Sequence, residues 1–228
     1  MNVIVAGADG PVGRLICREV LRHSHGVTAM IAEAVDAPDF RAMGCDVIVA
    51  DTRGRVTGAF DGADACIIAD GLPRSEKRRE IGLLDQNAVM NVIDGAEERL
   101  PRTGRANVPQ ADTAEAGVGR VVLLSFLDPT RFEGEPAGEQ RFHRTIRGDR
   151  RLMECPLAWS IIRPGEIVTQ GHGSGRIDAS TDLKSWREIE AGDVARTAVH
   201  ALLTGDADRK SIEITGGQTP IPEAVRTA

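Results

Sequence analysis

Three glycines near the start of the chain have the spacing of a phosphate-binding turn. They are Gly7, Gly10 and Gly13; an apolar run at 3–6 precedes them, and apolar residues recur at helical spacing after them. Because glycine has no Cβ, the backbone can turn sharply at Gly7, approach a pyrophosphate near Gly10 and pack a helix closely on the strand at Gly13. The N–H groups at the start of that helix would face the anion. The turn therefore predicts a dinucleotide site, with a purely structural strand–helix turn as the alternative.

The end of the second predicted strand should lie beside the adenosine ribose of such a dinucleotide. Residues 27–31 form this strand, and Ala32 and Glu33 follow it. A carboxylate at this place hydrogen-bonds the ribose 2′-OH, whereas an arginine would bind a 2′-phosphate, so Glu33 favours NAD(H) over NADP(H). Three arginines lie in turns that could reach the same pocket: Arg14, Arg53 and Arg55. Both cofactors therefore stay open, with the balance toward NAD(H).

The elements that must position these residues alternate between strands and helices. Apolar runs predict further strands at 46–50, 63–69, 121–126, 159–162 and 211–215. Apolar residues at helical spacing predict helices at 37–43, 80–100, about 139–155 and 191–203. This alternation predicts an α/β fold, a doubly wound parallel sheet with helices on both faces. Two stretches rich in glycine, proline or polar residues predict a surface insertion at 101–116 and a hairpin tip at 171–177.

Residues that follow strand ends are candidate ligand contacts, because ligands bind at the carboxyl edge of a doubly wound sheet. Asp51 and Thr52 follow the third strand, where Asp51 is placed to bond an adenine amino group or to cap the next turn. Ala69, Asp70 and Gly71 close the fourth strand, where the glycine lets the backbone approach the nicotinamide ribose or makes a simple turn. Together with the first turn and the end of strand two, the predicted cofactor contacts are Gly7, Ala8, Asp9, Gly10, Pro11, Val12, Gly13, Arg14, Ala32, Glu33, Asp51, Thr52, Ala69, Asp70 and Gly71.

The composition is typical of a soluble globular chain. Its 228 residues, 41% hydrophobic and 27% charged, suffice for one α/β domain but are few for two, and no internal repeat divides them. We therefore expect a single domain over residues 1–228, with a substrate cleft formed by the segments at about 127–138 and 166–190. The net charge of -6 argues against a general nucleic-acid surface.

The cysteines and the N-terminus predict a cytoplasmic protein. The four cysteines lie far apart without a C-x-x-C pair, which favours reduced thiols over a metal site or disulfides: Cys17, Cys45, Cys66 and Cys155. The N-terminus enters a strand without a charged leader. No apolar run reaches the roughly 18 to 20 residues that span a bilayer. We therefore expect no membrane partner and no bound metal.

The order of these motifs resembles the atypical short-chain dehydrogenase/reductase group, in particular its NmrA-like NAD(P)-binding members. The likeness spans nearly the full length. It rests on the glycine turn, Ala50-Asp51, the helix at 85–94 with Asn91, Ser125 after the fifth strand, I-I-R-P-G at 161–165 and G-D-V-A within 190–203. The resemblance implies a Rossmann fold with strand order 3-2-1-4-5-6, a bound NAD(P)(H), and a substrate over the nicotinamide beneath the C-terminal segments. It also adds Pro164 and Gly165 to the expected cofactor contacts.

The chain departs from that group in two places. Members that prefer NADP(H) usually carry a basic residue at the end of strand two, where this chain has Ala32. The catalytic tyrosine of the group is missing, because the chain has no tyrosine. In active members a serine orients the carbonyl, the tyrosine gives the proton, and a lysine four residues later lowers the tyrosine pKa and holds the ribose. Here the same helix offers His143 and, four residues later, Arg147, which share a helix face.

The predicted catalytic residues are therefore Ser125, His143 and Arg147. Ser125 would donate its hydroxyl hydrogen to the growing negative oxygen, and His143 has an ordinary pKa of about 6.5 that suits proton transfer. Arg147 would bind the ribose or a phosphate, since it stays charged. The alternatives are a strand-end cap for Ser125 and a solvated side chain for His143. His172, in a glycine-rich loop, is a weaker candidate.

These residues predict an NAD(P)(H)-dependent reductase of a small molecule that carries a carbonyl, a quinone or a conjugated alkene. The missing tyrosine supports a second class, a protein that senses the NAD(P) pool without turnover. A third class is an isomerase or epimerase of a specialised pathway. The expected partner is a small-molecule substrate, and the oligomeric state is open, with a homodimer as one option.

Overall fold

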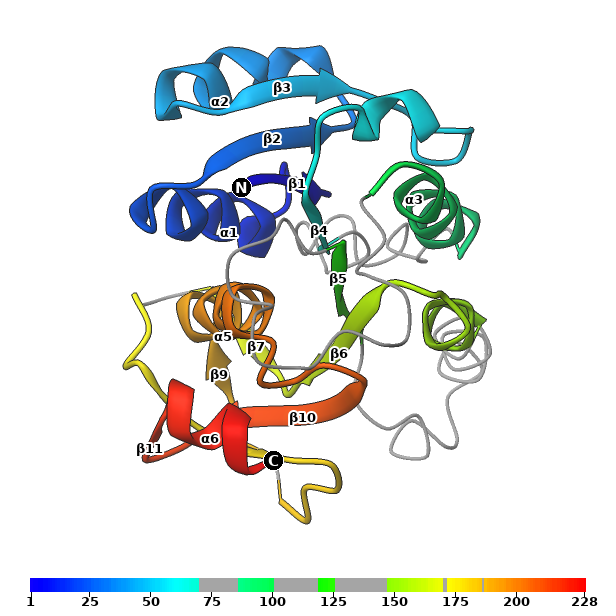
Figure 1. Ribbon diagram of the computed structural model, residues 1–228. Coiled ribbons are helices and arrows are strands. Elements are labelled where there is room, and N and C mark those ends of the chain that lie inside the picture. Colours follow the sequence, from blue (N-terminus) through cyan, green and yellow to red (C-terminus); the bar gives the residue numbers. More distant parts are fainter. Residues whose placement is uncertain (70–85, 101–118, 126–146, 170–171, 186) are drawn as a thin grey trace, which may run out of the picture.

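The computed structural model describes residues 1–69, 86–100, 119–125, 147–169, 172–185 and 187–228. In this part of the chain a large, mostly parallel sheet has helices on both faces (Figure 1). This is the doubly wound α/β fold that the sequence predicts. Several predictions concern residues outside the described ranges: the site residues Asp70, Gly71 and His143, the insertion at 101–116, the cleft segment at about 127–138 and the first part of the helix at about 139–155.

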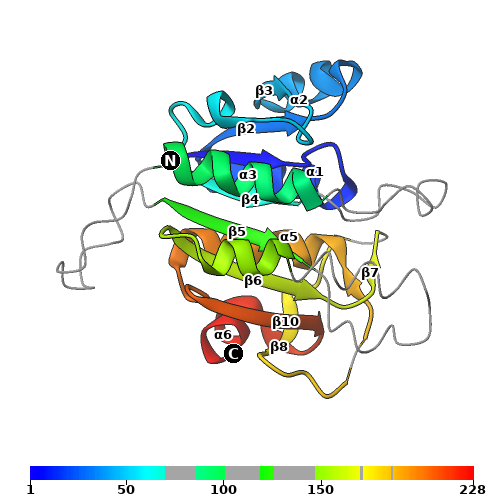
Figure 2. The same ribbon diagram turned by 90° about the vertical axis from the view of Figure 1, so that its right-hand side faces the viewer.

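Six strands form the first part of the sheet. In chain order they are β1 (Asn2–Ala6), β2 (Gly26–Ile31), β3 (Asp46–Val49), β4 (Ala65–Ile68), β5 (Arg120–Leu124) and β6 (Ala158–Pro164). Their order across the sheet is β3-β2-β1-β4-β5-β6, which confirms the expected order 3-2-1-4-5-6. Each neighbouring pair is parallel, so the carboxyl ends of these strands meet at one edge (Figure 2).

The C-terminal part of the chain extends the sheet beyond β6. Strand β10 (Lys210–Gly216) pairs in parallel with β6, and β8 (Arg176–Ser180) pairs antiparallel with β10. Strand β11 (Thr219–Pro220) follows at the edge, and β7 (Ile167–Val168) and β9 (Ile189–Glu190) form a separate pair. The predicted hairpin tip at 171–177 is wrong, because its last two residues belong to β8, whose partners come later in the chain. The left-handed backbone of Gly173 and Gly175, with φ of 82° and 74°, gives the sequence its turn-like character just before that strand.

Different helices cover the two faces of the sheet (Figure 1). One face packs against α1 (Pro11–Arg22), α2 (Ala37–Met43), α5 (Ala191–Thr204) and α6 (Ile221–Thr227). The other face packs against α3 (Gln86–Arg99), the 3₁₀ turn η2 (Thr57–Phe60) and the helical residues 147–153. Alternation along the strands sorts the two cores, since Leu124 of β5 belongs to the first core and Leu123 to the second. The residue after Leu124 should therefore point toward α3 and 147–153.

A buried arginine ties the amino edge of the sheet to α5. Arg120, the first residue of β5, donates to both carboxylate oxygens of Asp208, at 2.7 and 2.8 Å. Its Nη1 donates to the carbonyl oxygen of Leu202, in the last turn of α5. A cation at this place also meets the negative end of the helix dipole.

Among the described helices, none has the length and apolar character needed to cross a membrane.

Candidate functional site

The glycine turn joins β1 to α1 in the tight geometry that its spacing predicts. Gly7 has a φ of 75°, in the left-handed region, and its carbonyl oxygen accepts a hydrogen bond from Gly10 N at 3.1 Å. A Cβ on Gly13 would lie 2.2 Å from Gly7 O, and a Cβ on Gly10 would lie 3.3 Å from the same oxygen. A side chain at Gly13 would therefore push the helix off the strand.

The start of α1 offers backbone donors that the helix itself does not use. Gly10 is the N-cap and makes no side-chain capping bond, and the first turn has no acidic residue. The first bond within the helix runs from Arg14 N to Gly10 O at 3.0 Å. The amides of Val12 and Gly13 precede that bond and so lack an intrahelical acceptor, while Pro11 has no N–H. These amides fit the diphosphate of a dinucleotide, which would complete their hydrogen bonding.

The predicted adenosine pocket is bordered by acidic side chains. Ala32 and Glu33 are exposed just after β2, and Ala32 N donates to Asp9 Oδ2 at 3.4 Å, which links the end of β2 to the glycine turn. Arg14 pairs with two carboxylates at the start of α2, at 3.9 Å from Asp36 and 3.5 Å from Asp39. Its guanidinium also stacks over the Phe40 ring, 4.6 Å from the centroid. Arg14 therefore lies among the carboxylates at the start of α2.

The other two arginines near this pocket also have carboxylate partners. Arg53 Nε lies 2.9 Å from Asp51 Oδ1, and this hydrogen-bonded pair lowers the pKa of the Asp51 carboxyl. Arg55 Nη2 donates to Glu98 of α3 at 3.0 Å. The backbone here is fixed by Asn91 of α3, whose amide donates to Thr52 O at 3.0 Å.

Residues at the ends of β4 and β6 have structural roles of their own. Ala69 is buried and its N donates to Ala6 O at 2.9 Å, which extends the ladder between β4 and β1. Pro164 ends β6 and is buried, and Gly165 N donates to Ile214 O of β10 at 2.8 Å. A Cβ on Gly165 would lie 2.8 Å from Arg187 O, so close backbone packing explains this glycine. Its contact with a cofactor stays a prediction.

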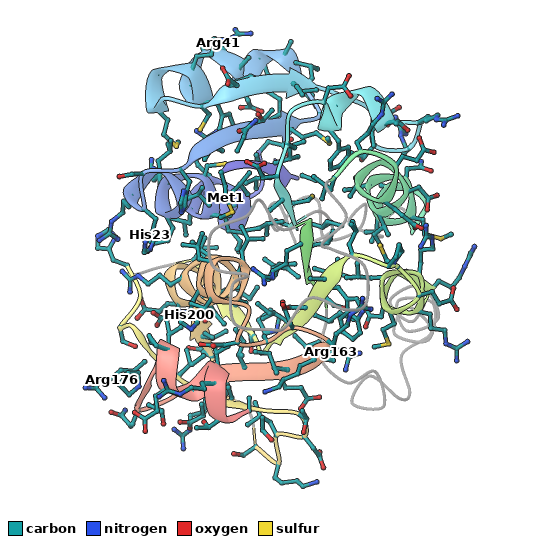
Figure 3. All side chains as sticks on the ribbon, in the orientation of Figure 1. Met1, His23, Arg41, Arg163, Arg176 and His200 are labelled. Carbon is teal, nitrogen blue, oxygen red and sulfur yellow. The ribbon has the colours of Figure 1, made fainter. Side chains whose placement is uncertain are left out.

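Ser125 belongs to a buried polar group at the carboxyl edge of the sheet. The register pairs Leu124 with Ile162, so the next residues, Ser125 and Arg163, lie side by side on the face covered by residues 147–153. Ser125 Oγ donates to Asp149 Oδ1 at 2.9 Å, and Arg163 Nη2 donates to Asp149 Oδ2 at 2.8 Å. Figure 3 shows Arg163 on the side of the sheet where residues 147–153 lie. We call Ser125, Asp149 and Arg163 the edge triad.

The edge triad changes the chemistry expected of Ser125. Burial raises the pKa of Asp149, while the hydrogen bonds from Arg163 and Ser125 oppose that rise. When Asp149 is a carboxylate, the Ser125 hydroxyl donates its one hydrogen to Asp149. Ser125 can then act only as a hydrogen-bond acceptor toward a ligand. Arg147 is exposed at the start of the described helical residues, whereas Ser125 is buried. Sequence reasoning missed Asp149, although it lies two residues after Arg147, and gave Arg163 no role of its own within the R-P-G motif.

The residues around the weaker candidate His172 are held to the start of α5. Gly175 N donates to Asp193 Oδ1 at 2.7 Å, and Ser174 N donates to Asp193 Oδ2 at 2.8 Å. Arg196 Nη2 donates to the His172 carbonyl oxygen at 2.9 Å. The G-D-V-A motif therefore supplies, through Asp193, the acceptor that orders this loop.

In the described residues no set of three or more His, Cys, Asp and Glu side chains is arranged to hold a metal ion.

Comparison with known proteins agrees with this geometry. The NAD(P)H-binding family matches residues 7–204 of the chain. The uncharacterized sugar epimerase YhfK of Bacillus subtilis is 26% identical over 231 residues, which cover 99% of each chain. A solved structure from Bacillus halodurans, named as an NAD-dependent epimerase/dehydratase, has a TM-score of 0.81 at 24% identity and full coverage of both chains.

A reductase is also among the structural neighbours. ChuY of Escherichia coli O157:H7, an anaerobillin reductase, has a TM-score of 0.67 at 19% identity over 94% of this chain and 97% of its own. At these identities the solved structures show the fold alone. Together with the family match, they confirm the expected NAD(P)-binding Rossmann fold.

Proposed function

Because the chain belongs to the NAD(P)H-binding family, we propose that it is a reductase that uses NAD(P)H to reduce a small molecule. The substrate would carry a carbonyl, a quinone or a conjugated alkene. The observation that carries this proposal is the glycine turn. The first amides of α1 have no intrahelical acceptor, and Gly13 packs so closely on the strand that a Cβ would not fit there. Bound NAD(P)H would supply a hydride to the substrate carbon.

The residues of this chain divide the work between binding and chemistry. Val12 and Gly13 would donate their amides to the diphosphate, and Glu33 would accept from the adenosine ribose. Ser125 lies at the same edge of the sheet, because the strands β1, β4 and β5 are parallel neighbours. We therefore place the reacting part of the substrate near Ser125.

Calorimetric titration with NAD⁺, NADH, NADP⁺ and NADPH, followed by turnover assays, tests this proposal. The assays follow the oxidation of NADH and NADPH with menadione, phenanthrenequinone, flavin mononucleotide and cyclohexenone. We expect binding of at least one nucleotide and turnover of at least one acceptor. Absence of heat with all four nucleotides would refute the cofactor site. Tight binding without turnover of any acceptor would favour the NAD(P) sensor over the reductase.

The name of the Bacillus subtilis relative supports a second candidate function, a sugar epimerase. Such an enzyme would remove a hydride from a sugar carbon and return it to the other face, without net oxidation of the cofactor. The assay incubates the protein with NAD⁺ and UDP-glucose and analyses the sugars by chromatography. Interconversion of epimers together with an absence of net NADH oxidation in the acceptor assays would replace the reductase proposal.

We further propose that the protein prefers NAD(H). The support is electrostatic: the rim after β2 carries Glu33, and Arg14 lies between Asp36 and Asp39 at the start of α2. A 2′-phosphate would bring additional negative charge to this acidic rim.

The preference is tested by comparing the dissociation constants of NADH and NADPH. Glu33→Ala should raise the affinity for NADPH by about five- to tenfold, because removal of one nearby surface charge is worth about 1 kcal/mol. Glu154→Ala, which removes an exposed carboxylate on a distant element, is the matched control. Tighter binding of NADPH than NADH by the unaltered protein would overturn the preference.

A further inference from the structure

One buried carboxyl group lies directly behind the serine at the reaction edge. Asp149 is 4% exposed, and its two oxygens are held by Ser125 at 2.9 Å and Arg163 at 2.8 Å. Ser125 is also 4% exposed. The serine hydroxyl therefore connects a buried ionisable group with the carboxyl edge of the sheet.

The protonation state of Asp149 decides what Ser125 can offer to a ligand. A carboxylate accepts the serine hydrogen, which leaves Ser125 as a hydrogen-bond acceptor toward the ligand. A carboxylic acid can instead donate its own hydrogen to Ser125 Oγ. The serine hydrogen is then released to point at the ligand, and Ser125 becomes a donor.

We propose that Asp149 stores the proton that Ser125 delivers to the substrate. This proposal rests on the reductase function proposed above. During reduction of a carbonyl, one hydride passes from the bound nicotinamide to the carbonyl carbon, and the Ser125 hydroxyl proton passes to the carbonyl oxygen. The Asp149 carboxyl proton passes to Ser125 Oγ, which restores the hydroxyl. Asp149 is left as a carboxylate beside Arg163 and regains a proton from water before the next turnover, so the substrate gains two electrons and two hydrogens.

The surroundings of Asp149 suit a group that must exist in both forms. Burial favours the acid, and the Arg163 guanidinium favours the carboxylate. The other charged groups of the described residues on or directly after its helix are Arg147, Arg150, Arg151 and Glu154, and Arg151 is paired with Asp94 and Glu97 of α3. Asp149 would thus supply the proton that the catalytic tyrosine supplies in the wider group. It acts through Ser125, so it need not touch the substrate.

The first measurement needs no substrate. The carboxyl carbon of Asp149 is followed by ¹³C NMR as the pH is changed, with Asp149→Asn used to assign its signal. We expect Asp149 to titrate above the ordinary aspartate range, and Arg163→Gln to move that titration to higher pH. An Asp149 that titrates below the ordinary range in the unaltered protein would overturn the proposal, because such a group would hold no proton to give.

The second measurement is the pH profile of turnover with NADH and menadione, or with the acceptor that the unaltered protein reduces fastest. Asp149→Asn should lower kcat by about 100-fold at low pH with little change in KM, since general acid catalysis is typically worth at least that. Arg163→Gln should keep turnover but shift the pH at which kcat falls to higher values, in step with the NMR titration. A merely structural role would not move that pH.

The matched control is Asp94→Asn, which alters another arginine–carboxylate pair on the same face without touching Ser125. It should leave kcat and its pH profile unchanged. An unaltered protein that binds NADH but reduces no acceptor would overturn the reductase function and the proton store with it. Turnover that is unaffected by Asp149→Asn in the folded variant would overturn the proton store alone.

Discussion

Two arginine–carboxylate pairs lie at opposite edges of the same sheet. At the amino edge, Arg120 holds both oxygens of Asp208 and also the end of α5. At the carboxyl edge, Arg163 holds only one oxygen of Asp149, and the other oxygen accepts from Ser125. In the first pair both carboxylate oxygens of Asp208 bind one arginine. In the second pair one oxygen of Asp149 binds Ser125, whose hydroxyl group can exchange a proton.

The contrast indicates that the amino edge contributes to stability alone, whereas the carboxyl edge also holds the groups proposed to act on a ligand. A bidentate pair with an added helix carbonyl fixes one arrangement of β5, α5 and the turn after it. The edge triad is connected instead to a serine at the edge where ligands of such sheets bind. Changes at the amino edge should therefore alter folding alone, and changes at the carboxyl edge should alter ligand binding or titration.

The largest effect is expected for Gly13→Ala at the carboxyl edge. The new Cβ would lie 2.2 Å from Gly7 O, and the helix must move away from the strand. We expect about 3 kcal/mol of lost stability, at the upper end of overpacking costs, and at least a hundredfold weaker NADH binding. Urea denaturation and calorimetry measure the two effects. Gly58→Ala, with nothing within 4 Å of the added atom, is the control. NADH affinity equal to that of the unaltered protein would show that the diphosphate lies elsewhere.

The next effect is expected for Arg120→Met at the amino edge. Removal of the guanidinium leaves Asp208 and the Leu202 carbonyl without this donor, and the side chain of Asp208 is 33% exposed. Breaking a fully buried pair costs about 3 to 5 kcal/mol, so we expect about 2 kcal/mol here because water reaches Asp208. Urea denaturation measures the loss, and NADH affinity should stay the same. Arg22→Met, at an exposed arginine of α1, should change stability by less than about 0.5 kcal/mol. A fall in NADH affinity in Arg120→Met would contradict the separation between the two edges.

A smaller effect is expected in the pH dependence of stability at Asp149. Its pKa is raised in the folded protein, so the acid form binds its proton more tightly when folded than when unfolded. The resulting stability is complete below the unfolded pKa and is lost as the pH rises through the folded pKa. Relative to Asp149→Asn, the unaltered protein should lose about 1.4 kcal/mol for each unit by which the pKa is raised. Urea denaturation at a series of pH values measures this difference. If the unaltered protein instead gains stability relative to Asp149→Asn as the pH rises, Arg163 outweighs burial in setting the pKa of Asp149.

The sequence predicted the elements of the carboxyl edge better than their contacts. The glycine turn was predictable because each of Gly7, Gly10 and Gly13 has a local steric reason, and the order of the parallel strands followed from the resemblance. The edge triad depends on register instead. Asp149 and Arg163 are 14 residues apart and Ser125 and Asp149 are 24 apart, so only the packed sheet and helix show that they meet.

Two further contacts illustrate the same limit. The cofactor contact of Gly165 stays a prediction, and the close approach of Arg187 O gives this glycine an additional packing role that no local pattern reveals. The arginines near the adenosine pocket were expected to be able to swing toward it. Arg53 pairs locally with Asp51, but the partners of Arg14 and Arg55 lie on other elements, such as Glu98 on α3 for Arg55, and helix packing brings these charges together.

The smallest effect is expected for Arg53→Gln, at an arginine–carboxylate pair that is exposed to water on both sides. The hydrogen bonds from Arg53 hold the pKa of Asp51 below its ordinary value. Such a group contributes stability above its unfolded pKa and loses that contribution as the pH falls through the folded pKa. Removal of Arg53 should return the Asp51 pKa toward the ordinary aspartate value, as followed by NMR, while solvent and salt screening leave the midpoint of urea denaturation near neutral pH unchanged. Arg18→Gln, an exposed arginine in the middle of α1, is the control. A large loss of stability in Arg53→Gln would mean that an exposed pair contributes as much to the free energy of unfolding as the pair of Arg120 and Asp208. Burial would then not explain the difference between the two edges of the sheet.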